Sequence, residues 1–225
     1  MKIEELTLFS NNLTKQKIFY SEILEFEEII PYSDKEISFK VGNSILKFIQ
    51  NKEATPYHFA INIFSNKEQE ALFWLKERVS ILTDGKTEIQ NFESWNAKAI
   101  YFYDEDKNIV EFIARKNQQL NSKNAFSTNS LLEISEIGFP TDNIEKVFNK
   151  LNQEISILIY SGDFDEFCAI GDEKGMFICV NQFKKKWFPI NDKIFPSGFK
   201  AKIQQNTKHF VVEYSKDILS ITQQI

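Results

Sequence analysis

Short segments in which apolar and polar residues alternate recur along this chain, and this alternation predicts β-strands. One such strand at residues 3–10 is followed by a helix at 13–24, whose apolar residues recur at helical spacing. Further alternating segments predict three more strands, at residues 27–31, 36–41 and 44–50. The first 50 residues are therefore predicted to form one unit with the order strand, helix and three strands.

The same order of elements returns twice, which indicates an internal repeat. The second unit has its strand, helix and three further strands predicted at residues 58–64, 66–79, 86–90, 98–103 and 109–114. The third unit has the same series predicted at residues 132–139, 142–152, 157–160, 165–170 and 175–181. Residues 183–198 are predicted to form a loop, and 199–214 a final strand or hairpin.

These repeats predict an α+β fold of tandem βαβββ units that form a half-open mixed β-barrel with helices on the outside. We expect residues 1–115 to be one domain, in which the units at 3–50 and 57–114 pair in a single curved sheet. Residues 116–130 are polar and predict a linker. Residues 131–225 are expected to hold a third, degenerate unit completed by the C-terminal strands.

Alternation also assigns side chains to the two faces of each strand. In the strand at 58–64, the large apolar residues face the helix, so that His58 and Asn62 face the concave side of the sheet. The same reasoning applied to three other strands places Glu5, Lys47 and Glu111 on that side. If the first two units pair, unlike charges meet in an apolar bowl, an arrangement typical of active sites.

Composition and charge exclude several classes of function. The net charge is −5, and acidic residues and lysines are interspersed, so that there is no basic patch for a nucleic acid. We expect a cytoplasmic protein, because there is no apolar run long enough to cross a membrane and no signal peptide. The 22 phenylalanines predict an aromatic core, and Cys168 and Cys179 are expected to be a buried pair of thiols.

The segment 95–112 resembles the closing hairpin of the vicinal oxygen chelate superfamily. It contains an aromatic strand (Tyr101–Tyr103), an acidic turn (Asp104–Asp106), Lys107–Asn108 where Gly-Asn is usual, two apolar residues, and then Glu111 and Phe112. The superfamily includes glyoxalase I, bleomycin-resistance proteins, fosfomycin-resistance proteins and extradiol dioxygenases. The resemblance covers residues 3–114 and, more weakly, 133–181. It implies a glyoxalase-like fold, on which many different reactions are known.

The resemblance also implies a metal site. Metal-binding members place His, Glu or Gln at the four strand positions that Glu5, Lys47, His58 and Glu111 occupy here. This implies one divalent ion, Mn, Fe, Zn or Ni, bound by Glu5, His58 and Glu111, with open positions for a substrate that has two vicinal oxygens. Glu111 and Glu5 are the candidates for moving a proton. Lys47 departs from the pattern, because an ammonium group cannot be a metal ligand.

Two classes of function therefore stay open. The first is a metal-dependent enzyme of the glyoxalase or dioxygenase type, with lyase, isomerase or dioxygenase chemistry. The second is a metal-free protein that binds or sequesters a small molecule, in which Lys47 bridges Glu5 and Glu111. Under either hypothesis the ligand-binding residues are expected to be Phe9, Lys47, Asn62, Trp95 and Tyr101.

Two of the candidate site residues also have a purely structural interpretation. His58 can be an ordinary hydrogen-bonded residue, and Glu5 can be a residue near an exposed strand edge. Glu136 occupies the same strand position in the third unit as Glu5 does in the first. Because Ile178 occupies the position expected to match Glu111, we interpret the third unit as a degenerate half-site. Homodimerisation is also left open.

Overall fold

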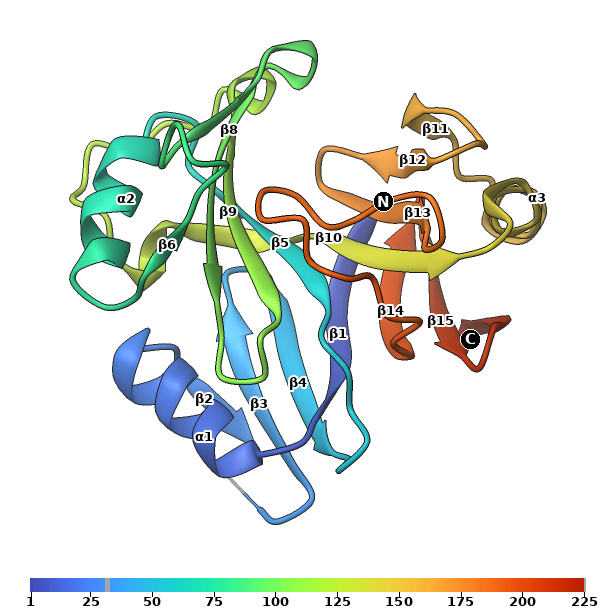
Figure 1. Cartoon of the computed structure of the whole chain (residues 1–225), viewed down its shortest axis with the longest axis horizontal. Coiled ribbons are helices and arrows are strands. Elements are labelled where there is room, and N and C mark those ends of the chain that lie inside the picture. Colours follow the sequence, from blue (N-terminus) through green and yellow to red (C-terminus); the bar gives the residue numbers. More distant parts are fainter. Residues whose placement is uncertain (31–32, 225) are drawn as a thin grey trace.

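The computed structural model describes residues 1–30 and 33–224 and consists of two curled mixed β-sheets with helices at the periphery (Figure 1). The α+β, glyoxalase-like fold class predicted from the repeats is confirmed. Pro31, the last residue of the strand predicted at 27–31, lies outside the described residues.

The first sheet has seven strands in the order β16-β15-β14-β1-β4-β3-β2. Their bounds are β1 (Lys2–Ser10), β2 (Glu28–Ile30), β3 (Glu36–Val41), β4 (Ser44–Gln50), β14 (Phe199–Gln205), β15 (Lys208–Ser215) and β16 (Ile218–Gln224). The sequence predicted β14 and β15 as a final strand or hairpin, whereas β16 was not predicted.

The second sheet has nine strands, eight of them in the order β11-β12-β13-β10-β5-β9-β8-β6, with β7 also paired to β8. Their bounds are β5 (His58–Ile63), β6 (Ile81–Leu82), β7 (Gln90–Phe92), β8 (Ala97–Tyr103), β9 (Ile109–Arg115), β10 (Leu131–Thr141), β11 (Ile159–Gly162), β12 (Phe167–Asp172) and β13 (Gly175–Asn181). The strand expected at 86–90 is replaced by the two short strands β6 and β7.

Each of the three long helices follows the first strand of a unit, as predicted. They are α1 (Leu13–Lys17), which continues as π-helical turns over Ile18–Ile23, α2 (Glu68–Lys76) and α3 (Ile144–Ile155). Single 3₁₀ turns occur at Glu93–Trp95, Lys116–Gln118 and Thr128–Ser130. The side chains of Asn12 and Asn143 accept hydrogen bonds from backbone N–H groups in the first turns of α1 and α3, which explains where these two helices begin.

The predicted pairing of the first two units is wrong. β5 of the second unit pairs with β10 of the third, and β1 of the first unit pairs with β14 of the C-terminal segment. The third unit is therefore not completed by the C-terminal strands, and residues 116–130 connect β9 to β10 within one sheet. Alternation along a strand reports which face is buried, but it carries no information on which unit supplies the neighbouring strand.

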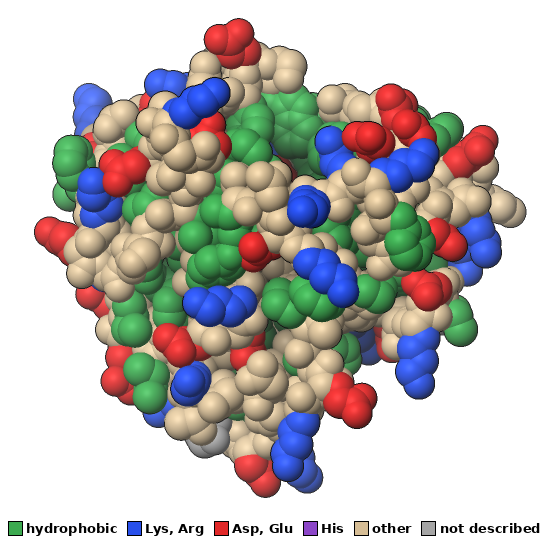
Figure 2. Space-filling view, viewed as in Figure 1, with side chains coloured by type: hydrophobic (Ala, Val, Ile, Leu, Met, Phe, Trp, Pro, Cys, Tyr) green, Lys and Arg blue, Asp and Glu red, His purple; other side chains and the backbone are tan. Residues whose placement is uncertain are grey.

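Charged side chains of both signs are interspersed over the face of the molecule seen in Figure 2. None of the helices among residues 1–30 and 33–224 is long and apolar enough to cross a membrane. Cys168 on β12 and Cys179 on β13 lie opposite each other as buried free thiols, as predicted.

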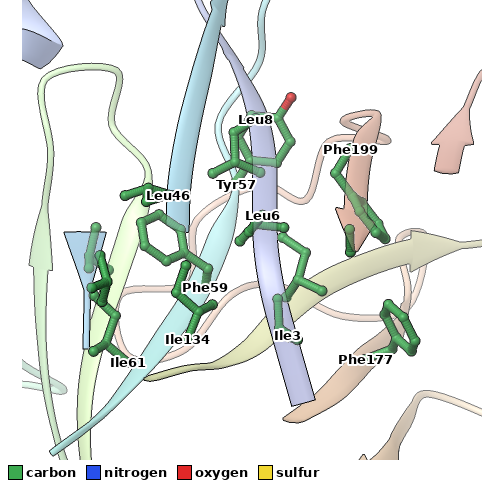
Figure 3. Packing of buried hydrophobic residues seen from close by; sticks show 14 of the residues in the cluster. Ile3, Leu6, Leu8, Leu46, Tyr57, Phe59, Ile61, Ile134, Phe177 and Phe199 are labelled. Carbon is green, nitrogen blue, oxygen red and sulfur yellow. The ribbon is translucent and has the colours of Figure 1, made fainter. Parts of the chain in front are cut away.

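The core lies between the two sheets (Figure 3). Leu6 of β1 and Leu46 of β4 pack with Phe59 of β5 and Ile134 of β10, and all four side chains are fully buried. Alternation assigned Phe59 to the packed side of its strand, whereas Ile134 and Glu136 reach opposite faces of β10 because the register shifts between them. Phe139, Phe177 and Phe199 extend the core toward the C-terminal strands with edge-to-face and stacked ring contacts, in line with the expected aromatic core. Because one core joins both sheets, it fixes the strands that carry the site.

Candidate metal centre

Three buried ionisable side chains meet on the face of the second sheet that points away from this core. The Nε2 atom of His58 lies 3.5 Å from Oε2 of Glu111 and 3.8 Å from Oε2 of Glu136. One donor atom from each of the three residues lies within 4.8 Å of the other two, a spacing that suits a single metal ion. All three are buried to more than nine-tenths.

Strand register explains this convergence. Ala60 of β5 is directly opposite Glu111 of the parallel strand β9 and also opposite Glu136 of the antiparallel strand β10. His58 precedes Ala60 by two residues, so its side chain is on the same face as both carboxylates. The small side chain of Ala60 leaves room between them, which allows the two carboxylates to approach the imidazole.

The surroundings of His58 hold its imidazole so that Nε2 is directed at the two carboxylates. Its Nδ1 atom lies 3.3 Å from the carbonyl oxygen of Ile109, an outer contact of the kind that commonly orients a metal-binding imidazole. The imidazole ring also contacts Trp187, with 5.1 Å between ring centroids. A hydrogen bond and a packed ring therefore fix the orientation of the imidazole.

Glu136 is held by a second layer of polar groups. One of its oxygens, Oε1, forms a short ion pair with Nη2 of Arg115, whose Nε donates a 3.1 Å hydrogen bond to Oδ1 of Asn62. Arg115 is only 1 % exposed. Burial alone would raise the pKa of Glu136, but the hydrogen bond from His58 and the charge of Arg115 outweigh it and lower this pKa. Glu136 is thus ionised, with Oε2 free to face His58.

Glu111 has the opposite electrostatic environment. Burial, followed by the negative charge of Glu136, raises the pKa of Glu111 well above its usual range, although Arg115 and a hydrogen bond from Tyr101 oppose the shift. Two buried carboxylates thus face a single arginine, Arg115. A proton on Glu111 or a bound cation would balance the carboxylate that Arg115 does not pair with.

The donor set fits a divalent transition metal. One imidazole and two carboxylates are ligands that Mn(II), Fe(II) and Zn(II) accept, and three protein ligands leave positions open for a substrate. The outer layer of Arg115 and Asn62 would orient the Glu136 ligand in the way that second-shell groups commonly do. No lysine amine of the described residues lies within ion-pair distance of Glu111 or Glu136.

A cavity of about 400 Å³ opens above the three residues. Figure 2 shows it as an apolar hollow near the top of the molecule, between β8 and the β11–β12 hairpin. The ring-bearing side chains of its wall are Phe92, Trp95, Tyr101, Phe167, Trp187 and Phe188. The last two belong to the segment 183–198, which was predicted as a loop and packs on His58 through Trp187. Asp192 anchors this segment through a 2.5 Å hydrogen bond from the hydroxyl of Tyr103 to Oδ2.

The structure separates the residues that were expected to form one site. Glu5 lies on the first sheet and pairs with Lys202 at 3.0 Å, and Lys47 pairs with Glu36 at 2.8 Å on the same sheet. The expected convergence of Glu5 and Lys47 with the residues of the second sheet is therefore wrong. The physical reason is the unit pairing, since the strand beside β5 is β10 rather than a strand of the first unit.

The expected ligand-binding residues are also divided between the sheets. Trp95 and Tyr101 line the cavity, whereas Asn62 lies behind it and holds Arg115. Phe9 is on β1 of the first sheet, where its backbone N–H donates to the hydroxyl of Tyr57. Phe9 therefore does not reach the cavity.

Two residues at the centre were missed as site residues. Glu136 was recognised as a carboxylate at an equivalent strand position, but the third unit was interpreted as a degenerate half-site. No role in the site was predicted for Arg115. Both carry a signal in the sequence, because each is a charged residue on a strand whose other residues are mostly apolar. A buried charge of this kind needs a partner of opposite sign.

Comparison with known proteins supports the fold. No family model and no curated protein matches the chain. Among solved structures, a "putative dioxygenase" from Bacillus subtilis subsp. subtilis str. 168 is similar over 99% of this chain and 84% of its own, with 12% identity and a TM-score of 0.64. This likeness extends over both sheets of the present chain.

Two smaller proteins match about half of the chain. Lactoylglutathione lyase from Agrobacterium tumefaciens has 16% identity and a TM-score of 0.42, covering 49% of this chain and 90% of its own. The fosfomycin resistance protein FosX from Listeria monocytogenes, in a complex with Mn(II) and 1S,2S-dihydroxypropylphosphonic acid, has 24% identity and a TM-score of 0.41, covering 53% and 93%. The fold that the resemblance implied is supported by the likeness to the Bacillus subtilis protein, which extends over nearly the whole chain.

Proposed function

We propose, from the vicinal oxygen chelate fold of this chain, that it holds one divalent metal ion on His58, Glu111 and Glu136 and binds a small molecule in the cavity above them. The observation that carries the proposal is the convergence of one buried imidazole and two buried carboxylates, whose donor atoms lie within 4.8 Å of one another and beside a single arginine. A divalent cation would remove the electrostatic penalty that raises the pKa of Glu111.

The residues of the centre would then have distinct roles. Glu136, fixed by Arg115, and His58, fixed by the carbonyl group of Ile109, are rigid ligands. When bound, the ion supplies a Lewis acid that two neighbouring oxygens of a ligand can reach. Glu111 accepts a hydrogen bond from the hydroxyl of Tyr101 and lines the cavity, and this position suits it to accept and return a proton of the substrate. We therefore favour a metal-dependent enzyme of the glyoxalase or dioxygenase type.

A second candidate function is a binding protein that works without metal. Arg115 already pairs with Glu136, and a proton on Glu111 would leave the centre neutral. In that case the aromatic cavity would hold an apolar ligand without performing chemistry on it. Arg115 would then have the role that the sequence suggested for Lys47.

Metal analysis and thermal unfolding distinguish the two candidates. Protein purified without chelator and without a histidine tag should contain about one equivalent of a divalent metal per chain. EDTA should lower the melting temperature, and Mn(II) or Zn(II) should restore it, because an ion at a hundred times its Kd stabilises a folded protein by about 2.7 kcal/mol. A protein without metal, whose melting temperature responds to neither EDTA nor Mn(II), would instead support the metal-free binding protein.

A further inference from the structure

The cavity has opposite electrostatic character at its two ends. Its floor carries the carboxylates of Glu111 and Glu136, and its rim carries the amines of Lys185 and Lys186. Apolar side chains and rings form the wall between them. A ligand that fills this space must therefore present different groups at its two ends.

Lys186 is the rim amine whose charge is available to a ligand. Its neighbours on the same segment are engaged, since Lys184 pairs with Asp165 and Nζ of Lys185 lies 3.6 Å from Oε2 of Glu166. Lys186 forms no ion pair with any acidic residue in the part of the chain that the structure describes. It is an exposed residue at the cavity and directly precedes Trp187, whose ring packs on His58.

We infer that the cavity takes an aromatic ligand that carries a carboxylate, with the ring between the aromatic walls and the carboxylate at the rim beside Lys186. This inference rests on the proposed function only in placing the ligand in the same cavity. The volume of about 400 Å³ is near the lower end of the roughly 300–1,000 Å³ found for small-molecule sites, which suits a ligand of one or two rings.

Charge fixes the orientation of such a ligand. In the metal-free cavity a carboxylate at the floor would lie against the buried carboxyl groups of Glu111 and Glu136, whereas at the rim it meets the exposed amine of Lys186. The ligand would therefore direct its uncharged end to the floor and its carboxylate to Lys186. Rings stacked between Trp95, Phe167 and Phe188 would supply most of the affinity, and Lys186 would supply the preference for an anion.

Isothermal titration calorimetry with a pair of probes of nearly equal shape tests this inference. The probes are 2-naphthoate and the neutral 2-naphthamide, titrated into the protein at low salt in EDTA, so that a metal cannot capture the carboxylate. Wild type should bind 2-naphthoate up to about five-fold more tightly, which is the range expected for one solvent-exposed ion pair. In Lys186→Gln the two probes should bind with nearly equal affinity.

Lys184→Gln is the matched control, because this neighbouring lysine pairs with Asp165 and does not line the cavity. It should keep the preference for 2-naphthoate. Equal affinity of wild type for both probes, no binding of either probe, or an unchanged preference in Lys186→Gln would each overturn the inference. Mn(II) titrations of the same proteins report on the metal centre separately, since Lys186→Gln should bind Mn(II) as wild type does. A wild-type protein that does not bind Mn(II) would thus count against the proposed function alone.

Discussion

Three equivalent strand positions exist in each of the two sheets, and the residues that occupy them have opposite charges in the two sheets. In the second sheet, Ala60 lies between Glu111 and Glu136, and His58 is two residues before it. In the first sheet, Thr7 lies between Lys47 of β4 and Lys200 of β14, and Glu5 is two residues before it. One imidazole with two carboxylates in one sheet thus corresponds to one carboxylate with two amines in the other.

The difference shows that this strand register alone does not make a metal site. In the first sheet Glu5 and Lys47 each have a single partner of opposite charge, Lys202 and Glu36, and the four side chains are between 18% and 39% exposed. In the second sheet the carboxylates are nearly inaccessible, lie under an aromatic wall and outnumber the one arginine. Burial without local charge balance is what creates a demand for a cation.

The largest effect is expected from removing the buried cation. Arg115→Met leaves Glu136 ionised and without its partner at a position that is almost fully buried, which should cost about 3–5 kcal/mol of unfolding free energy in EDTA. Urea unfolding measures this loss. Added Mn(II) should restore part of the stability, since the ion would then carry the missing positive charge. A loss below about 1 kcal/mol would show that Arg115 does not compensate Glu136.

Mn(II) affinity should depend on His58 of the second sheet and be independent of Glu5 of the first sheet. His58→Ala should weaken Mn(II) binding by more than the roughly 10–100-fold that removal of an outer-shell partner costs, because one of three direct ligands is lost. Glu5→Ala, at the equivalent position of the first sheet, is the control and should leave Mn(II) affinity unchanged. Titration calorimetry of both variants measures the Mn(II) affinity. A weaker affinity in Glu5→Ala would contradict the assignment of the site to the second sheet.

The free energy of unfolding is expected to depend on pH through Asp104, which lies where α1 meets the turn between β8 and β9. Asp104 is buried there and accepts hydrogen bonds from Tyr20 at 2.9 Å and from Gln16 at 3.1 Å. Burial raises the pKa of Asp104 from 3.8 to about 6, although hydrogen bonds from Asn108 and Tyr20 oppose the shift.

The folded protein therefore holds a proton on Asp104 that the unfolded chain releases at lower pH. The stability that this proton provides is fully present below about pH 4 and is lost as the pH rises through about 6, by about 2–3 kcal/mol. Urea unfolding in EDTA at pH 4 to 7 should show this decline. Asp104→Asn should remove that part of the pH dependence, while the contributions of Glu111 and the other carboxylates remain. An equal slope in both proteins would contradict the assignment.

The smallest effect is expected for an ion pair of the first sheet. Lys202→Met removes the partner of Glu5, but Glu5 is 18% exposed and can be hydrated, so the loss should stay within about 1 kcal/mol. The same urea measurement applies. A loss as large as that of Arg115→Met would show that the two sheets do not differ in the way their exposure indicates.

Much of the fold could be predicted from sequence because its signals are local. The alternation of residues 58–64 and 109–114 assigned Phe59 and Phe112 to the core and His58 and Glu111 to the opposite face, and the structure agrees. The acidic turn before Asn108 identified the hairpin and hence the glyoxalase-like fold. These features depend on the two-residue period of a strand and on turn chemistry, both of which the neighbouring residues determine.

The composition of the candidate site depended on the tertiary structure. Sequence by itself placed a histidine and a carboxylate on one face of the second unit, and it noted Glu136 as an equivalent carboxylate. Only the tertiary structure decided that β10 lies beside β5, which brings Glu136 and Arg115 to His58 and leaves Glu5 and Lys47 on another sheet. The physical reason is that several units present compatible strand edges, and the packing of the whole core selects which two edges pair.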